Sequence, residues 1–243
     1  MRPKKNKEPL RWVIGTHACK EAILQNPSWV LEVIIQDTKA RDHEALEKLC
    51  SKQKLPVKTK GGKFLNSIAE GHQGVAVALN DRPRWSDESA DRDSSLVVML
   101  DGITDPHNLG AILRTAWLLE VDGLFIPKNR SVDLTPVVCK VASGGAEHVP
   151  VESIQFQSQI SWFKEKGYWI YGLAEAGKQS LPQTQFAEKS VIIVGSEGAG
   201  MRSSTQGFCD QLIRIPQAES GSSYNASVAF ALCVYEAARS RFL

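Results

Sequence analysis

Long apolar runs are missing from this chain of 243 residues. No run reaches the roughly 18–20 apolar residues that a membrane-crossing helix needs, so we expect no membrane partner. The basic stretch MRPKKNKEPLRW at the N-terminus is not followed by the apolar segment of a secretory signal. The apolar share of 42% is ordinary for a chain that folds around a core. Together these features predict a globular cytoplasmic protein.

Cysteine is scarce, and its spacing is irregular. An odd number of cysteines without a CxxC pair argues against a disulfide framework and against a zinc site, so we expect reduced structural thiols and no metal. The phosphate-binding patterns GxGxxG and GK[ST] are also absent, which disfavours an ordinary doubly wound nucleotide-binding enzyme. The five cysteines are Cys19, Cys50, Cys139, Cys209 and Cys233.

Excess charge of one sign is nearly absent overall, but the charge is unevenly placed. The formal net charge is only +2. Residues 1–63 contain fourteen Lys or Arg and seven Asp or Glu, a balance of +7 that leaves −5 for the rest. A basic first quarter indicates either a solvated surface or contact with a polyanion such as a nucleic acid.

Apolar patterns divide the chain into three parts. Residues 1–79 form a small α/β unit, with helices expected at 41–53 and 63–69 and strands at 30–36 and 75–79. Residues 80–95 are polar and lack an apolar period, which is typical of a linker. Residues 96–243 alternate apolar strands with helices, which predicts a mostly parallel sheet covered on both faces. Its strands are expected at 96–100, 123–126, 168–173, 191–194 and 212–215, and its helices at 109–120, 136–143, 155–166 and 226–240.

The stretch LDGITDPHNLGAILRTA, residues 100–116, places polar and turn-forming residues between an expected strand and an expected helix. Asn108 is positioned to cap that helix. Arg114 lies six residues further on and interrupts the apolar pattern. The residues alone leave two interpretations open: a plain cap followed by a surface arginine, or polar groups that meet a ligand beyond the strand.

Two more polar loops follow expected strands. In VIIVGSEGAGM, residues 191–201, Glu197 lies in a glycine-rich turn, where it either is solvated or accepts hydrogen bonds from a ligand. Ser223 and Asn225 precede the last helix and could simply cap it. Because parallel strands end at the same edge of a sheet, the polar groups of all three loops could converge on one crevice.

These loops together resemble the motifs of the SpoU family of RNA ribose 2′-O-methyltransferases, within the SPOUT class. The first motif is DPHNLGAILRTA, the second GSEGAGM and the third IPQAESGSSYNASVAFALCVYEA. The segments WVIGTHACKEAI and HQGVAVAL resemble the small RNA-binding domain, similar to some ribosomal proteins, that precedes the catalytic domain in many members. The full-length resemblance is nearest to bacterial enzymes that methylate guanosine in 23S rRNA, and the tRNA-modifying relatives are the alternative.

The resemblance implies a trefoil-knotted catalytic domain, S-adenosylmethionine as methyl donor, and a homodimer formed through the C-terminal domain with active sites near its interface. By resemblance, the cofactor pocket uses Gly195, Gly198, Ile215 and Tyr224. By the same resemblance, the polar catalytic set is Asn108, Arg114, Glu197, Ser223 and Asn225.

Two positions depart from the family pattern, and one implied role is chemically demanding. Tyr224 replaces the usual Leu and Gln217 the usual Met, both beside the expected adenine site. These departures are the support for a different hypothesis, an RNA-binding ribosome-assembly factor without catalysis. The family implies Arg114 as general base, yet a guanidinium normally stays protonated. Binding a phosphate or stabilising the developing oxyanion is the alternative role.

Overall fold

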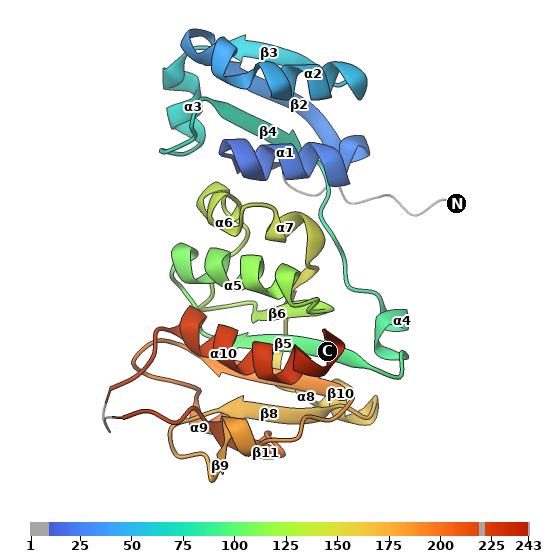
Figure 1. Cartoon of the computed structure of the whole chain (residues 1–243), viewed down its shortest axis with the longest axis vertical. Helices are drawn as coiled ribbons and strands as arrows, with labels where there is room; N and C mark the ends of the chain where they lie inside the picture. The colour runs from blue at the N-terminus through green and yellow to red at the C-terminus, as the bar shows by residue number, and fades with distance from the viewer. Residues whose placement is uncertain (1–9, 219–221, 243) are drawn as a thin grey trace. The chain divides into compact units, whose positions relative to one another are not determined.

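The structure, a computed structural model, describes residues 10–218 and 222–242 (Figure 1). Its contacts divide the chain into two compact units. The first unit contains the chain up to Pro83 together with Asp133–His148. The second contains Arg84–Val132 and the chain from Val149 onward. The segment 133–148, which the sequence places in the C-terminal domain, therefore packs as part of the first unit.

The first unit is built on a mixed sheet. Within the described part of the chain this sheet has four strands, in the order β1-β4-β2-β3. β4 runs antiparallel to β1 and β2, and β3 pairs parallel with β2. The elements of this unit are β1 Arg11–Ile14, α1 Thr16–Gln25, η1 Pro27–Trp29, β2 Val30–Gln36, η2 Asp37–His43, α2 Glu44–Lys52, β3 Val57–Lys60, α3 Gly62–Ile68, β4 Val75–Leu79, α6 Pro136–Ala142 and α7 Gly145–His148.

The second unit is built on a parallel sheet, as expected. Over the described ranges it has seven strands in the order β7-β6-β5-β10-β8-β11-β9, and every pairing is parallel. The elements of this unit are α4 Asp87–Ala90, β5 Ser95–Asp101, α5 Pro106–Leu118, β6 Gly123–Pro127, β7 Val151–Ile154, α8 Phe156–Glu165, β8 Trp169–Leu173, β9 Gln179–Ser180, η3 Leu181–Gln183, β10 Lys189–Gly195, α9 Ser203–Gln206, β11 Gln211–Arg214, α10 Ala226–Ala238 and η4 Arg239–Arg241.

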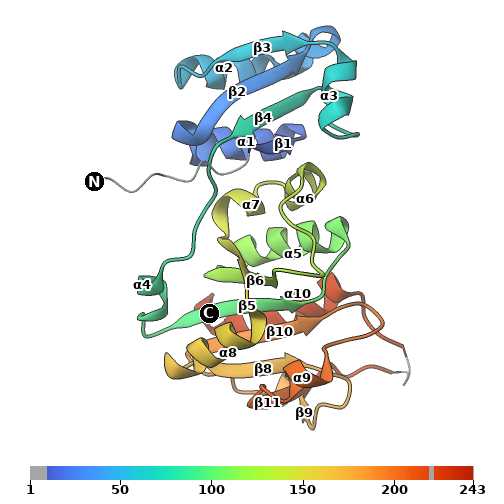
Figure 2. The ribbon, with the colours of Figure 1, turned by 180° about the vertical axis from the view of Figure 1, so that it is seen from behind.

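Helices cover both faces of this sheet because its strands are apolar on both sides. α5 packs beside α10 on the face seen in Figure 1, and α8 lies on the opposite face, toward the viewer in Figure 2. Val97 and Met99 join the core under α8. Val98 and Leu100 are equally buried and point to the other face, since side chains alternate along a strand. The prediction of a doubly covered parallel sheet is confirmed.

The expected elements of the sequence recur with shifted ends, and a few were missed. The helix expected from residue 109 begins three residues earlier, at Pro106. β3 was not expected because all four of its residues are exposed, so it carries no apolar face. The stretch 80–95 is partly folded: it contains α4, and Trp85 packs edge-on against Phe125 with ring centroids 5.4 Å apart.

The strand order places β11 in an unusual position. β11 lies between β8 and β9, although the chain passes through β8 and β9 first. The short connection between them crosses β11, where the Ala174 amide donates to the Ile213 carbonyl (2.9 Å). The Arg214 guanidinium then donates to the Gly177 carbonyl (3.1 Å). The β8–β9 connection thus passes over the segment around Ile213 and Arg214 and is hydrogen-bonded to it.

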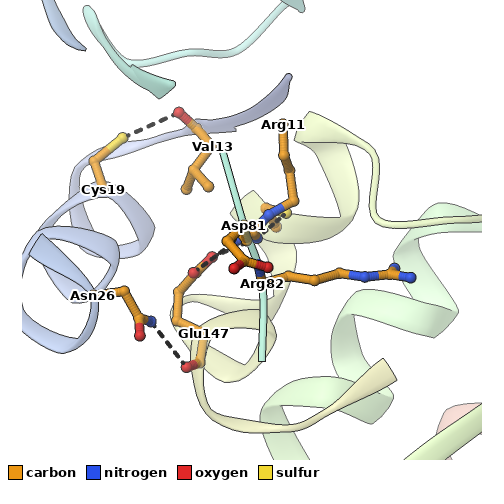
Figure 3. A network of polar contacts seen from close by, with 8 residues as sticks. Arg11, Val13, Cys19, Asn26, Asp81, Arg82 and Glu147 are labelled. Atoms are coloured by element: carbon orange, nitrogen blue, oxygen red, sulfur yellow. Dashed lines mark hydrogen bonds and ion pairs between the residues drawn. The ribbon is translucent and has the colours of Figure 1, made fainter. Parts of the chain in front are cut away.

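A buried ion pair fixes the 133–148 segment within the first unit (Figure 3). The two terminal guanidinium nitrogens of Arg11, Nη1 and Nη2, donate to the Glu147 carboxylate at 2.7 Å. The side chains are only 9% and 1% exposed. Asn26, at the end of α1, donates to the Glu147 carbonyl oxygen (3.4 Å). The segment is therefore joined to β1 and α1 by specific polar contacts.

Removing the Glu147 carboxylate should loosen this part of the first unit. Glu147→Ala leaves the Arg11 guanidinium buried without a counter-charge, a change that costs on the order of 3–5 kcal/mol. We expect amide hydrogen exchange to accelerate in α1, α6 and α7. Lys48→Ala is the matched control, since it breaks an exposed Lys48–Glu44 pair worth only about 0.3–0.5 kcal/mol. Equal effects of the two substitutions would contradict the assigned role.

Candidate functional site

Three loops meet at one edge of the larger sheet. They follow β5, β10 and β11 and contain residues 102–105, 196–202 and 215–225, of which 219–221 lie outside the described residues. The strands are parallel, so their carboxyl ends lie at the same edge. This is the crevice position that the sequence pattern predicts for ligand binding.

The first loop ends in a helix cap that frees Asn108. Asp105 is the N-cap of α5, and its carboxylate accepts from the His107 amide (3.0 Å). Pro106 occupies the first turn, where its missing N–H costs nothing. The interpretation of Asn108 as the cap is therefore wrong. Asn108 lies inside the first turn, 8% exposed, and its amide is available to other loops.

A hydrogen-bonded cluster joins the three loops. Asn108 donates through Nδ2 to Glu197 Oε2 (3.3 Å). Asn225 donates through Nδ2 to Asn108 Oδ1 (2.9 Å) and to Glu197 Oε2 (3.2 Å). Asn225 also caps α10, because its Oδ1 accepts from the Ser227 amide (2.9 Å). Capping and participation in the cluster, which the sequence left as alternatives, coexist in this one residue.

A second contact, which sequence reasoning missed, holds the glycine-rich loop in place. The Asp101 carboxylate, 3% exposed, accepts from the Arg202 amide (3.0 Å) and from Arg202 Nε (2.7 Å). Arg202 also lies over the Phe156 ring. The available signal was a carboxylate directly after a buried apolar strand, a position where an unpaired charge is costly.

A cavity of about 770 Å³ opens between the second and third loops. This volume lies within the range of about 300–1,000 Å³ that is common for small-molecule sites. The walls combine backbone, aliphatic side chains and the carboxylates of Glu175 and Glu197. The lining residues are Leu173–Ala176, Val194–Met201, Gln206, Ile213–Ala218, Ser222–Tyr224, Ala226 and Ala229.

Gly195 is required where β10 enters this loop. A Cβ atom at Gly195 would lie 2.1 Å from the Gly200 carbonyl carbon. Ser196 and Gly200 exchange backbone hydrogen bonds of 3.1 and 2.9 Å, which closes the loop into a tight turn. Only a residue without a side chain allows this return of the backbone, so the wall of the cavity is largely main chain.

The structure assembles most, but not all, of the expected site residues. Gly195, Gly198, Ile215 and Tyr224 all line the cavity, as do Glu197 and Ser223. Gln217, one of the two departures from the family pattern, donates to the Ser222 carbonyl and so spans the third loop.

Arg114 is the predicted residue that the chain does not bring into the cluster. It is exposed on α5, and no other described residue forms a hydrogen bond or ion pair with it. Asn108 is six residues away, which places the two on different sides of the helix. Arg114 instead shares a face with Leu118, four residues further on.

Exposed apolar side chains lie on α5 and on the neighbouring α10. Leu118 on α5 is 63% exposed. Val228, Leu232 and Tyr235 on the neighbouring α10 are spaced for one helix face and are 41–57% exposed. Isolated exposed apolar residues are normal, whereas a group of them on two packed helices is a candidate interaction surface.

Two kinds of feature are absent from the described ranges. There, no three His, Cys, Asp or Glu side chains are grouped so that they could hold a metal ion. No helix in the same ranges is long and apolar enough to cross a membrane. All five cysteines are described and are free thiols.

Two family models match separate N-terminal and C-terminal parts of the chain. A family model described as the SpoU rRNA Methylase family matches residues 95–235. A second, described as RNA 2′-O ribose methyltransferase substrate binding, matches residues 12–85.

Curated relatives match along nearly the whole chain. A Pseudomonas putida protein named 23S rRNA (guanosine-2′-O-)-methyltransferase RlmB is 34% identical, over 96% of this chain and 97% of that protein. A Staphylococcus haemolyticus protein described in terms of the TrmH family of tRNA/rRNA methyltransferases is 40% identical, over 94% and 95%.

A solved structure has the same fold. The SpoU methyltransferase AviRb from Streptomyces viridochromogenes, in complex with the cofactor AdoMet, superposes with a TM-score of 0.79. It is 22% identical in sequence, and the match covers 95% of this chain and 89% of that one. The matches to the family models and to the whole-length relatives agree with the three motifs at the crevice, and this chain belongs to the SpoU rRNA methylase family.

Proposed function

We propose that this protein transfers a methyl group from S-adenosylmethionine to a ribose 2′-hydroxyl of ribosomal RNA, with a guanosine of 23S rRNA as the target. The observation that carries the proposal is the Asn108–Glu197–Asn225 cluster at the edge of a cavity of cofactor size. The names of the whole-length relatives supply the RNA and the nucleoside. The free thiols fit a reducing cytoplasmic location.

The cavity has the chemistry that S-adenosylmethionine requires. Backbone groups of the 194–201 and 213–218 segments offer donors and acceptors for adenine and ribose. Ile215 and Tyr224 offer apolar surface, and the carboxylates of Glu175 and Glu197 complement the cationic sulfonium and ammonium groups. The space beside Gly198 is open, since a Cβ there would meet nothing within 4 Å. Bound here, the cofactor supplies an electrophilic methyl group.

The polar cluster then positions the ribose. Glu197 receives both amide hydrogen bonds through Oε2, and Oε1 accepts none from the described residues. In this proposal Oε1 accepts from the substrate hydroxyl, while Asn108 and Asn225 hold the carboxylate in place. Ser223, at the cavity wall, adds a hydroxyl beside the same substrate. Fixed donors and acceptors of this kind lower the barrier by orienting the reacting groups.

Arg114 completes the site as a cation for the phosphate or for the developing alkoxide. Its position on an exposed helix face, beside Leu118 and the apolar residues of α10, supports a homodimer that buries this face. In the dimer Arg114 lies near the interface, and so can serve a site to which both copies contribute.

The division of labour follows the two family models. The proposed RNA-binding domain is residues 1–79, joined by residues 80–95 to the catalytic domain 96–243. The trefoil knot is part of the proposal, supported by the crossing of the β8–β9 connection over β11.

A tRNA substrate is the second candidate, favoured by the description of the Staphylococcus haemolyticus relative. Mapping ribose methylation in rRNA and tRNA from a deletion strain distinguishes the two, and loss of no methyl group would favour a non-catalytic assembly factor.

Cofactor binding gives the first test. We expect calorimetry to detect S-adenosylmethionine with an affinity on the order of −5 to −8 kcal/mol. Ala176→Trp should abolish binding, because Ala176 is an exposed residue of the cavity wall and an indole there fills the cavity. Ala45→Trp, on an exposed face of α2, is the control and should bind normally. A folded wild-type protein that gives no heat at millimolar cofactor refutes the enzyme proposal.

Catalysis by Arg114 gives the second test. Arg114→Ala should lower single-turnover methyl transfer at least about a hundredfold, the scale for removing one stabilising group. Arg114→Lys should not restore the rate fully, because an ammonium lacks the planar fork of donors. Cofactor binding should be unchanged. Arg92→Ala, which removes an exposed arginine of the 80–95 linker, is the control. A near wild-type rate for Arg114→Ala would make Arg114 a plain surface residue.

The apolar face gives the third test. Leu232→Glu places a charge on this face of α10 and should convert a dimer to a monomer, as measured by light scattering. Methyl transfer should fall with the dimer. Leu24→Glu, at an equally exposed position on α1, should leave the mass unchanged. A wild-type protein that is monomeric at micromolar concentration would rule out the dimer.

A further inference from the structure

The turn Gly71–Gly74, sequence GHQG, is the part of the first unit that the proposed catalytic chemistry leaves unexplained. It joins α3 to β4 and contacts three other segments. His43 Nε2 donates to the Gln73 carbonyl (3.0 Å), and the Gly74 carbonyl accepts from the Gln36 amide (2.8 Å). On the other side, Gln73 Oε1 accepts from the Thr16 amide at the start of α1 (3.0 Å).

Two lysines from distant parts of the chain lie against this turn. A Cβ at Gly71 would be 2.7 Å from Lys140 Nζ. The stem of Lys140 packs on Gly15, where a Cβ would be 3.0 Å from its Cγ. A Cβ at Gly74 would be 2.8 Å from Lys39 Cδ. The glycines have positive φ and leave room for both lysine side chains.

The charges of these lysines are not neutralised by the protein. Among the described residues neither Lys39 nor Lys140 forms an ion pair, and Glu70, next to the turn, pairs with neither. Burial and then the positive charges of Lys39 and Lys140 lower the pKa of His72. Both ammonium groups therefore lie near enough to the His72 ring to disfavour its protonated form.

The remaining groups of the site are hydrogen-bond donors. Gln73 is exposed, and because its Oε1 accepts from Thr16, its Nε2 is the amide group left to donate to a ligand. α1 starts at Thr16 with no acidic residue in its first turn, so the positive end of its dipole faces the same place. Two ammonium groups, one amide and a helix end form a set that matches the oxygens of a phosphate.

We propose that Lys39, Lys140 and Gln73 form a binding site for a phosphate of the RNA backbone. The proposal rests on the proposed function, which supplies the RNA. Lys140 comes from the 133–148 segment, which the Arg11–Glu147 pair holds within this unit. The proposed phosphate site therefore combines distant parts of the sequence, because Lys140, which lies between β6 and β7 along the chain, completes a site on the N-terminal fold.

Variants that keep the fold test this site with full-length protein and an unmodified 23S rRNA transcript. Gln73→Glu retains the acceptor for the Thr16 amide but adds a negative charge, and should raise the Kd for RNA at least fivefold. Lys39→Ala/Lys140→Ala should raise it at least about tenfold at 0.1 M salt and make the slope of log K against log salt less negative by about 1–2.

The control removes the same charge elsewhere. Lys52→Ala/Lys54→Asn changes two exposed lysines at the end of α2 that form no ion pair with described residues, and should alter the Kd less than about threefold. Calorimetry with S-adenosylmethionine should give wild-type affinity for every variant. Site variants that bind RNA like the control overturn the phosphate site. If the wild-type protein binds RNA but transfers no methyl group, the proposed function is overturned, and the phosphate site is then judged from the RNA affinities of the variants alone. If the wild-type protein binds no RNA, both proposals are overturned.

Discussion

β11 can occupy its place between β8 and β9 only if the connection between those two strands passes over it. That constraint determines where the site is. The carboxyl end of β11 emerges beside Ala174–Gly177, and the third loop must start there, facing the loop that follows β10. The cavity exists because these two loops, and the turn after β8, are forced to share one edge of the sheet. An ordinary strand order would separate them.

The polar residues at this edge both stabilise helix starts and join the three loops. Asn225 caps α10 with its oxygen and binds the cluster with its nitrogen, so the helix start and the cluster geometry cannot be changed independently. Asn108 is free to join because Asp105 takes over the cap of α5. Asp101 fixes the far end of the glycine-rich loop through Arg202. The fold therefore sets the geometry of the cluster through these hydrogen bonds, and the proposed positioning of a weak nucleophile requires a geometry that is fixed in advance.

The chain passes between the two units not only at the linker but also at both ends of the 133–148 segment. The chain leaves the larger sheet after β6, contributes α6 and α7 to the first unit, and returns as β7. Its buried contact is the bidentate ion pair of Arg11 and Glu147. Loss of either side chain would leave the other as an uncompensated buried charge. Lys140 is carried by the same segment, so the surface of the first unit depends on residues far along the sequence.

The sequence by itself determined the strands of the parallel sheet and the positions of its polar loops. Short continuous apolar runs such as residues 96–100, bounded by turn residues, are typical of buried strands. The motifs around Asn108, Glu197 and Asn225 carry the family resemblance in a few adjacent residues. These signals depend only on residues that are close together in the sequence, so they can be recognised without the fold. Tertiary structure decided that Asp101 meets Arg202 and that Asn108 meets Glu197 and Asn225. It also decided that Arg11 pairs with Glu147 across 136 positions. Such pairings depend on strand order and on the path of the chain between layers, and neither periodicity nor spacing encodes them.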